Sequence, residues 1–289
     1  MIDINKLNPE KIKENFNINW LRPENVPLNI HKYLIFKKHF KKIKNKSKLL
    51  EVGCGNGINT FFFLRGKFDF NFDFYQNSNT DFFFKNKDIF DFSTKNSKVI
   101  IKKKPKIIFD LAIDLKKNLI SNAKSLNISK EYLVKDCNKK IIFKDKYDFI
   151  YSNIIYWLKN PYKSILEISN HLNKNGKFLL LLPNENFIKY CDSYTKTGKT
   201  WELLNRGRKK TMQIIINQAS FEKWLKKNKF KIVSKEQLFS SLTLKIWDFG
   251  LRPISPFLIK MSNSITLKSR TRIKEEWCNK LFPIVKEVT

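Results

Sequence analysis

The sequence predicts an α/β fold with a doubly wound, mostly parallel sheet, and three observations support this prediction. The short apolar stretch from Lys48 to Val52 runs directly into a glycine-rich turn, after which the periodicity becomes helical. From residue 106 onward, apolar stretches of strand length alternate with helical segments, the pattern of a parallel sheet covered on both faces. The chain has 289 residues, of which 42% are hydrophobic, so it can bury the core that such a sheet needs.

Three regions are expected along the chain. Residues 1–47 form a helical leader, because Ile30 to Ile43 carries apolar residues at helical spacing with lysines between them. Residues 48–183 form the core, with an insertion at 66–105 between its first helix and its second strand. Residues 184–289 are expected to complete the sheet and to add an appendage beside the functional site.

The insertion begins with a regular alternation. Phe68, Phe70, Phe72 and Phe74 are separated by single polar residues, and this period of two predicts a half-buried strand. Low complexity is the alternative explanation, but so regular an alternation favours a folded β insertion.

The other elements follow from periodicity and turn residues. We expect helices at 58–65, 119–126, 161–172, 221–227 and 272–281, and strands at 107–115, 131–134, 147–151, 177–182, 230–233 and 238–246. Asn175-Gly176 is expected to close the helix at 161–172.

The formal net charge of +31 suggests a nucleic acid or an anionic membrane as a partner. However, lysines are spread along nearly the whole chain together with many Asn, Ile and Phe residues, so compositional bias is the favoured explanation. The four cysteines form no CxxC pair and do not cluster with the three histidines, which predicts no metal site and a reduced, cytoplasmic protein. We expect neither a signal peptide nor a transmembrane segment.

The glycine-rich turn is the most specific motif. A strand ending in Glu51-x-Gly53-x-Gly55-x-Gly57 brings backbone close to a ligand, where side chains would intrude. The dinucleotide fingerprint would need glycine at the position of Ile58, and the Gly-Lys-Ser/Thr of a P-loop is absent.

The segment Glu51 to Gly57 resembles motif I of the class I S-adenosylmethionine-dependent methyltransferases, particularly the type 11 branch. The resemblance implies a Rossmann-like methyltransferase fold and S-adenosylmethionine as the cofactor. In that family the loop wraps the methionine part of the cofactor, and the acid at the position of Glu51 orders the loop. The resemblance extends over residues 48–183, about half of the chain.

Later motifs of the family also have counterparts. Asp114, at the end of the second core strand, resembles the acid that binds the ribose hydroxyls. Asp73 is a rival because it lies at the ordinary distance from the glycine loop, but Asp114 is preferred because its spacing to Asp136 is ordinary. Asp136 and Cys137 resemble the residues that meet the adenine. The cofactor-binding residues implied by the resemblance are Glu51, Gly53, Cys54, Gly55, Gly57, Asp114, Asp136, Cys137, Ser152 and Asn153.

The methyl acceptor is not identified by any motif. We expect transfer to an oxygen or nitrogen of a small molecule, a sugar or glycan precursor, or a lipid-linked intermediate. An RNA or DNA methyltransferase is the alternative that the charge suggests, although Asn/Asp-Pro-Pro-Tyr and Pro-Cys motifs are absent. A non-catalytic protein that keeps the cofactor fold is a further alternative.

No general base is identified, because transfer from a sulfonium requires mainly alignment and exclusion of water. The candidates for contact with the acceptor are Tyr156, Trp157, Tyr190, Asp192, Arg206 and Arg208. Arg206 and Arg208 flank one glycine and so are suited to clamp a phosphate or carboxylate. Leu251 to Ile265 is expected to pack as a lid, with peripheral contact to an anionic membrane as the alternative.

Overall fold

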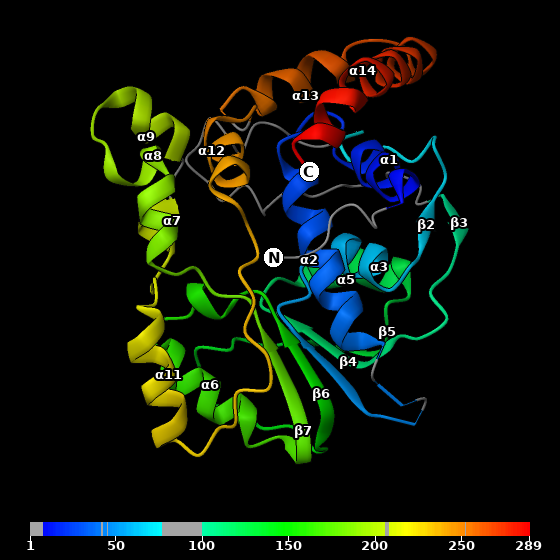
Figure 1. The fold of residues 1–289 in the computed structure, drawn as a ribbon. Coiled ribbons are helices and arrows are strands. Elements are labelled where there is room, and N and C mark those ends of the chain that lie inside the picture. Colours follow the sequence, from blue (N-terminus) through cyan, green and yellow to red (C-terminus); the bar gives the residue numbers. More distant parts are fainter. Residues whose placement is uncertain (1–7, 42, 45, 77–99, 206–207, 252) are drawn as a thin grey trace.

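The computed structural model describes residues 8–41, 43–44, 46–76, 100–205, 208–251 and 253–289. At its centre lies a five-stranded sheet in the order β5-β4-β1-β6-β7, in which all neighbouring strands are parallel (Figure 1). The strands are β1 (Leu49–Val52), β4 (Phe109–Asp114), β5 (Ser129–Val134), β6 (Tyr147–Ser152) and β7 (Leu172–Leu180). The chain moves outward from β1 to β5 and then returns to β6, so the order reverses between β1 and β6. The predicted doubly wound, Rossmann-like fold is thus confirmed.

Helices cover both faces of this sheet, and each face has its own core. One face packs against α2 (Asn25–Phe40), α3 (Ile58–Phe63) and α5 (Lys117–Leu126). The other face packs against α6 (Pro161–Ser169) and α11 (Gln218–Lys227). Leu49 belongs to the first core and Leu50 to the second, because successive strand residues point to opposite faces.

Further helices lie beyond the carboxyl ends of the strands, at the top of Figure 1. They are α1 (Pro9–Ile18), α7 (Glu185–Tyr190), α8 (Asp192–Thr195), α9 (Lys199–Asn205), α10 (Arg208–Thr211), α12 (Ser241–Phe249), α13 (Ser255–Asn263) and α14 (Leu267–Glu287). The short 3-10 helix η3 (Ile155–Trp157) directly follows β6. Because ligands of open α/β sheets bind at the carboxyl ends of the strands, these helices are placed to border such a site.

The strand predicted over 68–74 is wrong. Only β2 (Lys67–Phe68) is extended, and it pairs antiparallel with β3 (Ile101–Lys103). The chain then turns because the Asp69 and Asp73 carboxylates accept hydrogen bonds from backbone N–H groups two residues later, at 2.9 Å in both cases. The rest of the expected β insertion, residues 77–99, lies outside the described residues.

The carboxyl-terminal region also differs from the prediction. In the described part of 184–289, no strand joins the sheet, and Asn184 and Ile216 form only an isolated bridge. Residues 230–240 have no regular structure, and most of the strand predicted at 238–246 is instead helix α12. The Ser240 hydroxyl caps this helix by accepting a hydrogen bond from the Thr243 N–H at 3.0 Å, a signal that the weak alternation concealed.

A smaller correction concerns Asn175-Gly176. The helix before it, α6, already ends at Ser169, and both residues lie within β7. Asn175 has a φ of 67°, and the pairing of β7 with β6 shifts register at this point. The two residues therefore form an irregularity in a strand rather than the end of a helix.

Candidate active site

The glycine loop leaves the end of β1 with positive φ angles. Gly53 has a φ of 82°, and a Cβ there would lie 2.2 Å from Cγ1 of Ile154. Gly55 has a φ of 56°, but a Cβ there would meet nothing within 4 Å. The loop is therefore packed tightly at Gly53 and faces open space at Gly55, which leaves its backbone accessible to a bound cofactor. The residues present thus fit a cofactor held against this loop.

Asp114 lies directly beside this loop. It ends β4, the neighbour of β1, and its Oδ2 accepts a hydrogen bond from the Gly55 N–H at 2.9 Å. Its Oδ1 accepts one from the Lys116 N–H at 3.0 Å. The preceding carbonyl, of Ile113, accepts hydrogen bonds from the N–H groups of Gly53 and Cys54 at 2.8 and 3.0 Å. The structure therefore brings the Asp114 carboxylate against the glycine loop.

Asp73, the rival acid, lies in a different environment. Its side chain is buried, and its Oδ2 accepts a hydrogen bond from Nε of Arg270 on α14 at 2.6 Å. Its Oδ1 accepts one from the indole N–H of Trp20 at 3.1 Å. These contacts fasten the turn after β2 to α14 and to Trp20, which lies between α1 and α2. The role of Asp114 toward a ribose stays a prediction, but Asp73 is already committed to a structural ion pair.

Glu51 is buried at the base of the loop. Glu51 belongs to β1, and its Oε1 accepts a hydrogen bond from the hydroxyl of Thr60 on α3 at 2.5 Å. Burial raises the pKa of Glu51 to about 8, against the lowering effect of the Thr60 hydrogen bond and with a further increase from the Asp114 charge. Glu51 thus joins the strand before the loop to the helix after it, so it is placed to order the loop.

The remaining predicted cofactor residues follow β5 and β6. Asp136 accepts hydrogen bonds from the backbone N–H and side-chain amide of Asn138, at 2.9 and 3.0 Å, in a turn after β5. Cys137 is buried, and burial raises the pKa of its thiol to about 12. Asn153, which follows β6, is half-buried. These residues therefore lie at the same edge of the sheet as the glycine loop.

Ser152, which the resemblance implied as a cofactor-binding residue, has its hydroxyl engaged with a neighbouring strand. Its side chain is fully buried, and its hydroxyl donates to the Val52 carbonyl at 2.9 Å. The hydroxyl therefore ties the end of β6 to the end of β1. Its contribution is to hold the two strand ends that frame the site.

Two of the predicted acceptor residues, Tyr156 and Trp157, lie in η3, just past the end of β6. Their ring centroids are 5.0 Å apart in an edge-to-face arrangement, and burial raises the pKa of the Tyr156 hydroxyl. The Tyr156 carbonyl accepts a hydrogen bond from the Gln213 N–H at 2.8 Å. The backbone of η3 is thus tied at Tyr156 to the segment that follows α10.

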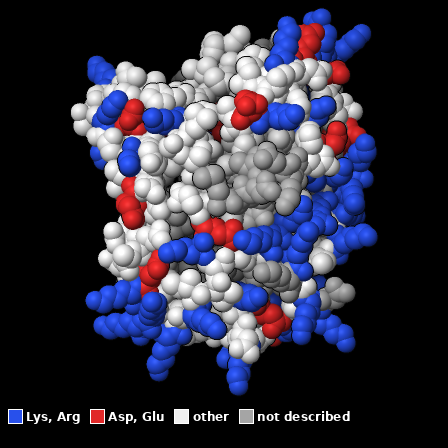
Figure 2. Space-filling model, viewed as in Figure 1, with Lys and Arg blue, Asp and Glu red and all other residues white. Residues whose placement is uncertain are grey.

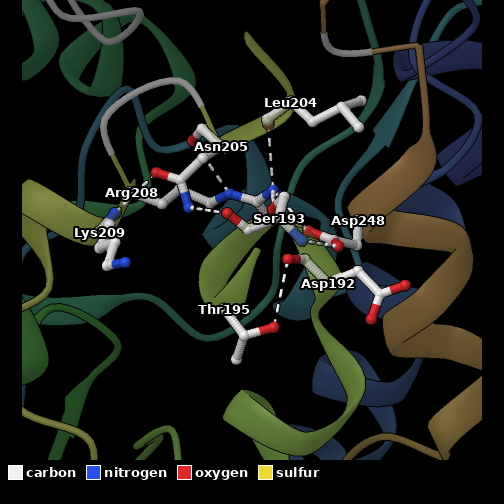
Figure 3. Close-up of polar contacts among 8 residues, drawn as sticks. All are labelled: Asp192, Ser193, Thr195, Leu204, Asn205, Arg208, Lys209 and Asp248. Carbon is white, nitrogen blue, oxygen red and sulfur yellow. Dashed lines mark hydrogen bonds and ion pairs between the residues drawn. The ribbon is translucent and has the colours of Figure 1, made fainter. Parts of the chain in front are cut away.

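Arg208 is buried and paired, whereas the sequence suggested a clamp for an acceptor anion. Its Nη2 donates to Oδ1 of Asp248 at 2.7 Å and to the Ser193 hydroxyl at 2.8 Å (Figure 3). Its guanidinium also lies 4.2 Å from the ring centroid of Trp247. Arg208 therefore holds α8 and α10 against α12. Arg206, the other half of the expected clamp, lies outside the described residues.

The other two candidates lie nearby on short helices. Tyr190 ends α7 and has the Lys189 ammonium 5.3 Å from its ring centroid. Asp192 begins α8 and pairs with Lys196 at 3.1 Å on the surface.

The sequence did not identify two contacts of the glycine loop: the packing of Ile154 against Gly53 and the hydrogen bond from the Thr60 hydroxyl to Glu51. Sequence spacing gives no indication of the Ile154 contact. Thr60, by contrast, stands in the first turn of the helix that follows the loop, and this position could have indicated its contact.

The family follows from a comparison with known domains. Residues 28–235, well over half of the chain, match a family profile described as a methyltransferase domain. The chain belongs to this methyltransferase family. It is a methyltransferase whose cofactor is S-adenosylmethionine, in agreement with the glycine loop and its neighbouring acids. No curated protein matches this methyltransferase significantly.

Several solved structures are similar to this methyltransferase at low identity. The YcgJ protein of Bacillus subtilis has 14% identity and a TM-score of 0.42, covering 68% of this chain and 67% of its own. A putative methyltransferase in complex with the Trm112 activator of Haloferax volcanii has 11% identity and a TM-score of 0.42, and the match covers 74% of this chain and 76% of that chain. The plantazolicin methyltransferase BpumL, solved with a triazolic desmethylPZN analogue and SAH, has 16% identity and a TM-score of 0.43, covering 91% of this chain and 84% of its own.

Among the described residues, no helix of this methyltransferase combines the length and the apolar character needed to span a membrane.

Proposed function

We propose that this methyltransferase transfers the methyl group of S-adenosylmethionine to an oxygen or nitrogen of a small-molecule, sugar, glycan-precursor or lipid-linked acceptor. The observation that carries the proposal is the contact between Asp114 and Gly55 at 2.9 Å. It places a carboxylate against a loop whose backbone faces open space. A carboxylate in this position can accept hydrogen bonds from both hydroxyls of a ribose.

The other residues have supporting roles in this proposal. Glu51 orders the glycine loop through Thr60, Asp136 and Cys137 meet the adenine, and Ser152 fixes the end of β6 beside the loop. The cofactor supplies a methyl group already activated on its sulfonium. The chain therefore has to align the acceptor with it and exclude water, which is a task of positioning more than of proton transfer.

Calorimetric titration with S-adenosylmethionine tests this proposal, using the wild type, Asp114→Asn and Asp73→Asn. We expect Asp114→Asn to weaken binding at least about tenfold, because a charge-assisted hydrogen bond contributes roughly 1.5–3 kcal/mol. Asp73→Asn should lower the thermal midpoint, since it leaves Arg270 buried without its counter-ion, but the folded protein should bind the cofactor normally.

Two results would contradict the proposal. Absence of binding to the folded wild type would remove the cofactor site altogether. Loss of binding in Asp73→Asn, with Asp114→Asn unaffected, would transfer the ribose contact to the other acid. Unfolding curves of all three proteins separate these outcomes from a general loss of folded protein.

A further inference from the structure

Helix α2 carries a row of side chains along the sheet toward the carboxyl ends of the strands. The ring of Phe40 lies 6.1 Å from that of Phe149 on β6, and the ring of Phe36 lies 5.2 Å from that of Tyr151. Tyr151 follows Phe149 by two residues on the strand, so α2 runs antiparallel to β6. One helical turn back along α2 therefore advances along β6 toward its carboxyl end.

Lys32 is the next residue in this row. It precedes Phe36 by four residues and so shares its face of the helix. One helical turn from Phe36 to Lys32 covers about 5.4 Å, whereas one strand residue covers about 3.3 Å. Starting opposite Tyr151, this step therefore goes beyond Ser152, the last residue of β6. The lysine side chain also leans toward the start of its helix. The row therefore directs Lys32 toward the edge where β6 leads into η3.

Lys32 has no partner there. The side chain is half-buried and makes no hydrogen bond or ion pair with any residue that the structure describes. Burial alone lowers its pKa to about 8. Lys274, on α14, has a pKa lowered to about 8 as well, but its ammonium donates to the carbonyls of Phe70 and Phe72, both at 2.7 Å. Lys274 thus has a structural task, which Lys32 lacks.

The titratable groups around α2 are otherwise engaged or do not act on Lys32. Glu236 pairs with Lys38 and His39, at 2.9 and 3.2 Å. The two ring nitrogens of His31 lie 2.9 and 2.6 Å from the carbonyl oxygens of Leu238 and Thr289.

The groups at the site itself are Glu51 on β1, Tyr151 on β6 and Tyr156 on η3, and none of them changes the pKa of Lys32. An unpaired ammonium that is partly withdrawn from water is costly, and a bound anion would reduce this cost.

We propose that Lys32 forms an anion subsite for the methyl acceptor, pairing with a carboxylate or phosphate group that the acceptor carries. The inference rests on the proposed function and names the substrate class as anionic. In the strand order β4-β1-β6, Asp114 ends the strand on one side of β1, and the row of α2 that includes Lys32 follows β6 on the other side. The carboxylate that binds the donor and the lysine that binds the acceptor thus belong to opposite sides of β1.

Binding of acetate and inorganic phosphate to the protein saturated with S-adenosylhomocysteine tests this inference by calorimetry. The variants are Lys32→Met, Lys32→Arg and, as a matched control, Lys38→Met, which removes an exposed lysine from the same helix. We expect Lys32→Met to weaken binding of both anions at least tenfold, while Lys32→Arg and Lys38→Met keep it. In the wild type, binding should decline as the pH rises through about 8, because the ammonium loses its proton.

The outcomes separate the two proposals. Equal anion binding in Lys32→Met and wild type, with binding of S-adenosylhomocysteine intact, overturns the Lys32 subsite alone. A tenfold loss of S-adenosylhomocysteine affinity in Lys32→Met also overturns it, since the lysine would then pair with the carboxylate of the cofactor. If the folded wild type bound no S-adenosylhomocysteine, the proposed function would fail and the subsite with it.

Discussion

Glu51 is a carboxyl group held inside the protein by a single hydrogen bond. Only 2% of the residue is exposed, and Oε2 has no hydrogen-bond partner among the described residues. The strand–turn–helix pattern requires this burial, because Glu51 points to the face of β1 that packs against α3. Glu51 orders the glycine loop, but the burial that this role needs destabilises its charged form.

This cost predicts a pH dependence of stability. The pKa of Glu51 is about 8 in the folded protein and near its ordinary value when unfolded, so the folded state holds the proton more tightly. The contribution to stability is complete below the unfolded pKa and is lost as the pH rises toward about 8, at up to about 1.4 kcal/mol per pH unit. In urea unfolding between pH 5 and 8, the wild type should lose stability relative to Glu51→Gln. Parallel pH profiles would contradict this expectation.

Asp114 and Asp73 show what residue-level prediction can and cannot reach. Their spacing along the chain favoured Asp114 only through its distance to the next motif. The sheet order decides where each acid lies, because β4 pairs with β1 and brings Asp114 to the Gly55 N–H. Asp73 meets Arg270, almost two hundred residues later, and no local pattern could predict that ion pair.

At the scale of elements, a buried ion pair fastens three of the helices after β7, α8, α10 and α12, to one another. Arg208 of α10 and Asp248 of α12 have side chains only 7% and 0% exposed. Asp248 also accepts hydrogen bonds from the backbone N–H and the hydroxyl of Ser193, at the start of α8. The Arg-Gly-Arg sequence looked like a clamp because its partner, forty residues later, is invisible in local spacing.

Removing this pair should loosen the contacts among α8, α10 and α12. We expect Arg208→Met to lower the free energy of unfolding by about 3–5 kcal/mol, because it leaves the Asp248 carboxylate buried without its counter-ion. Lys196→Met, which removes an exposed pair with Asp192, should cost less than about 1 kcal/mol. Urea denaturation measures both. A small effect of Arg208→Met would indicate that Asp248 is stabilised by Ser193 alone.

For the molecule as a whole, the dominant property is its net charge of +31. On the face shown in Figure 2, lysines and arginines lie along both sides and the lower edge and are densest along the flank that carries β2 and β3. Such a distribution creates a strong positive field, which attracts polyanions without defining a site.

The field predicts binding to nucleic acid that depends on salt but leads to no methylation. Affinity for a single-stranded oligonucleotide should fall steeply between about 50 and 200 mM salt, because binding releases counterions from the nucleic acid and added salt opposes this release. Heparin, a polyanion without bases, should compete equally well. Fluorescence anisotropy measures the binding, and labelled S-adenosylmethionine measures the transfer. Incorporation of label into RNA or DNA would contradict the proposed acceptor class.

The sequence by itself determined the parallel sheet, the helices that cover it and the glycine loop, because these depend on local periodicity and on backbone shapes that glycine permits. Tertiary structure decided which distant groups meet. The Phe68 to Phe74 alternation became turns because aspartates bind the local backbone, and the region after β7 became helices fastened by Arg208 and Asp248. Lys32 had no local signal at all. Its significance comes from its half-buried position without a counter-ion among the described residues, and this position arises only when α2 packs along β6.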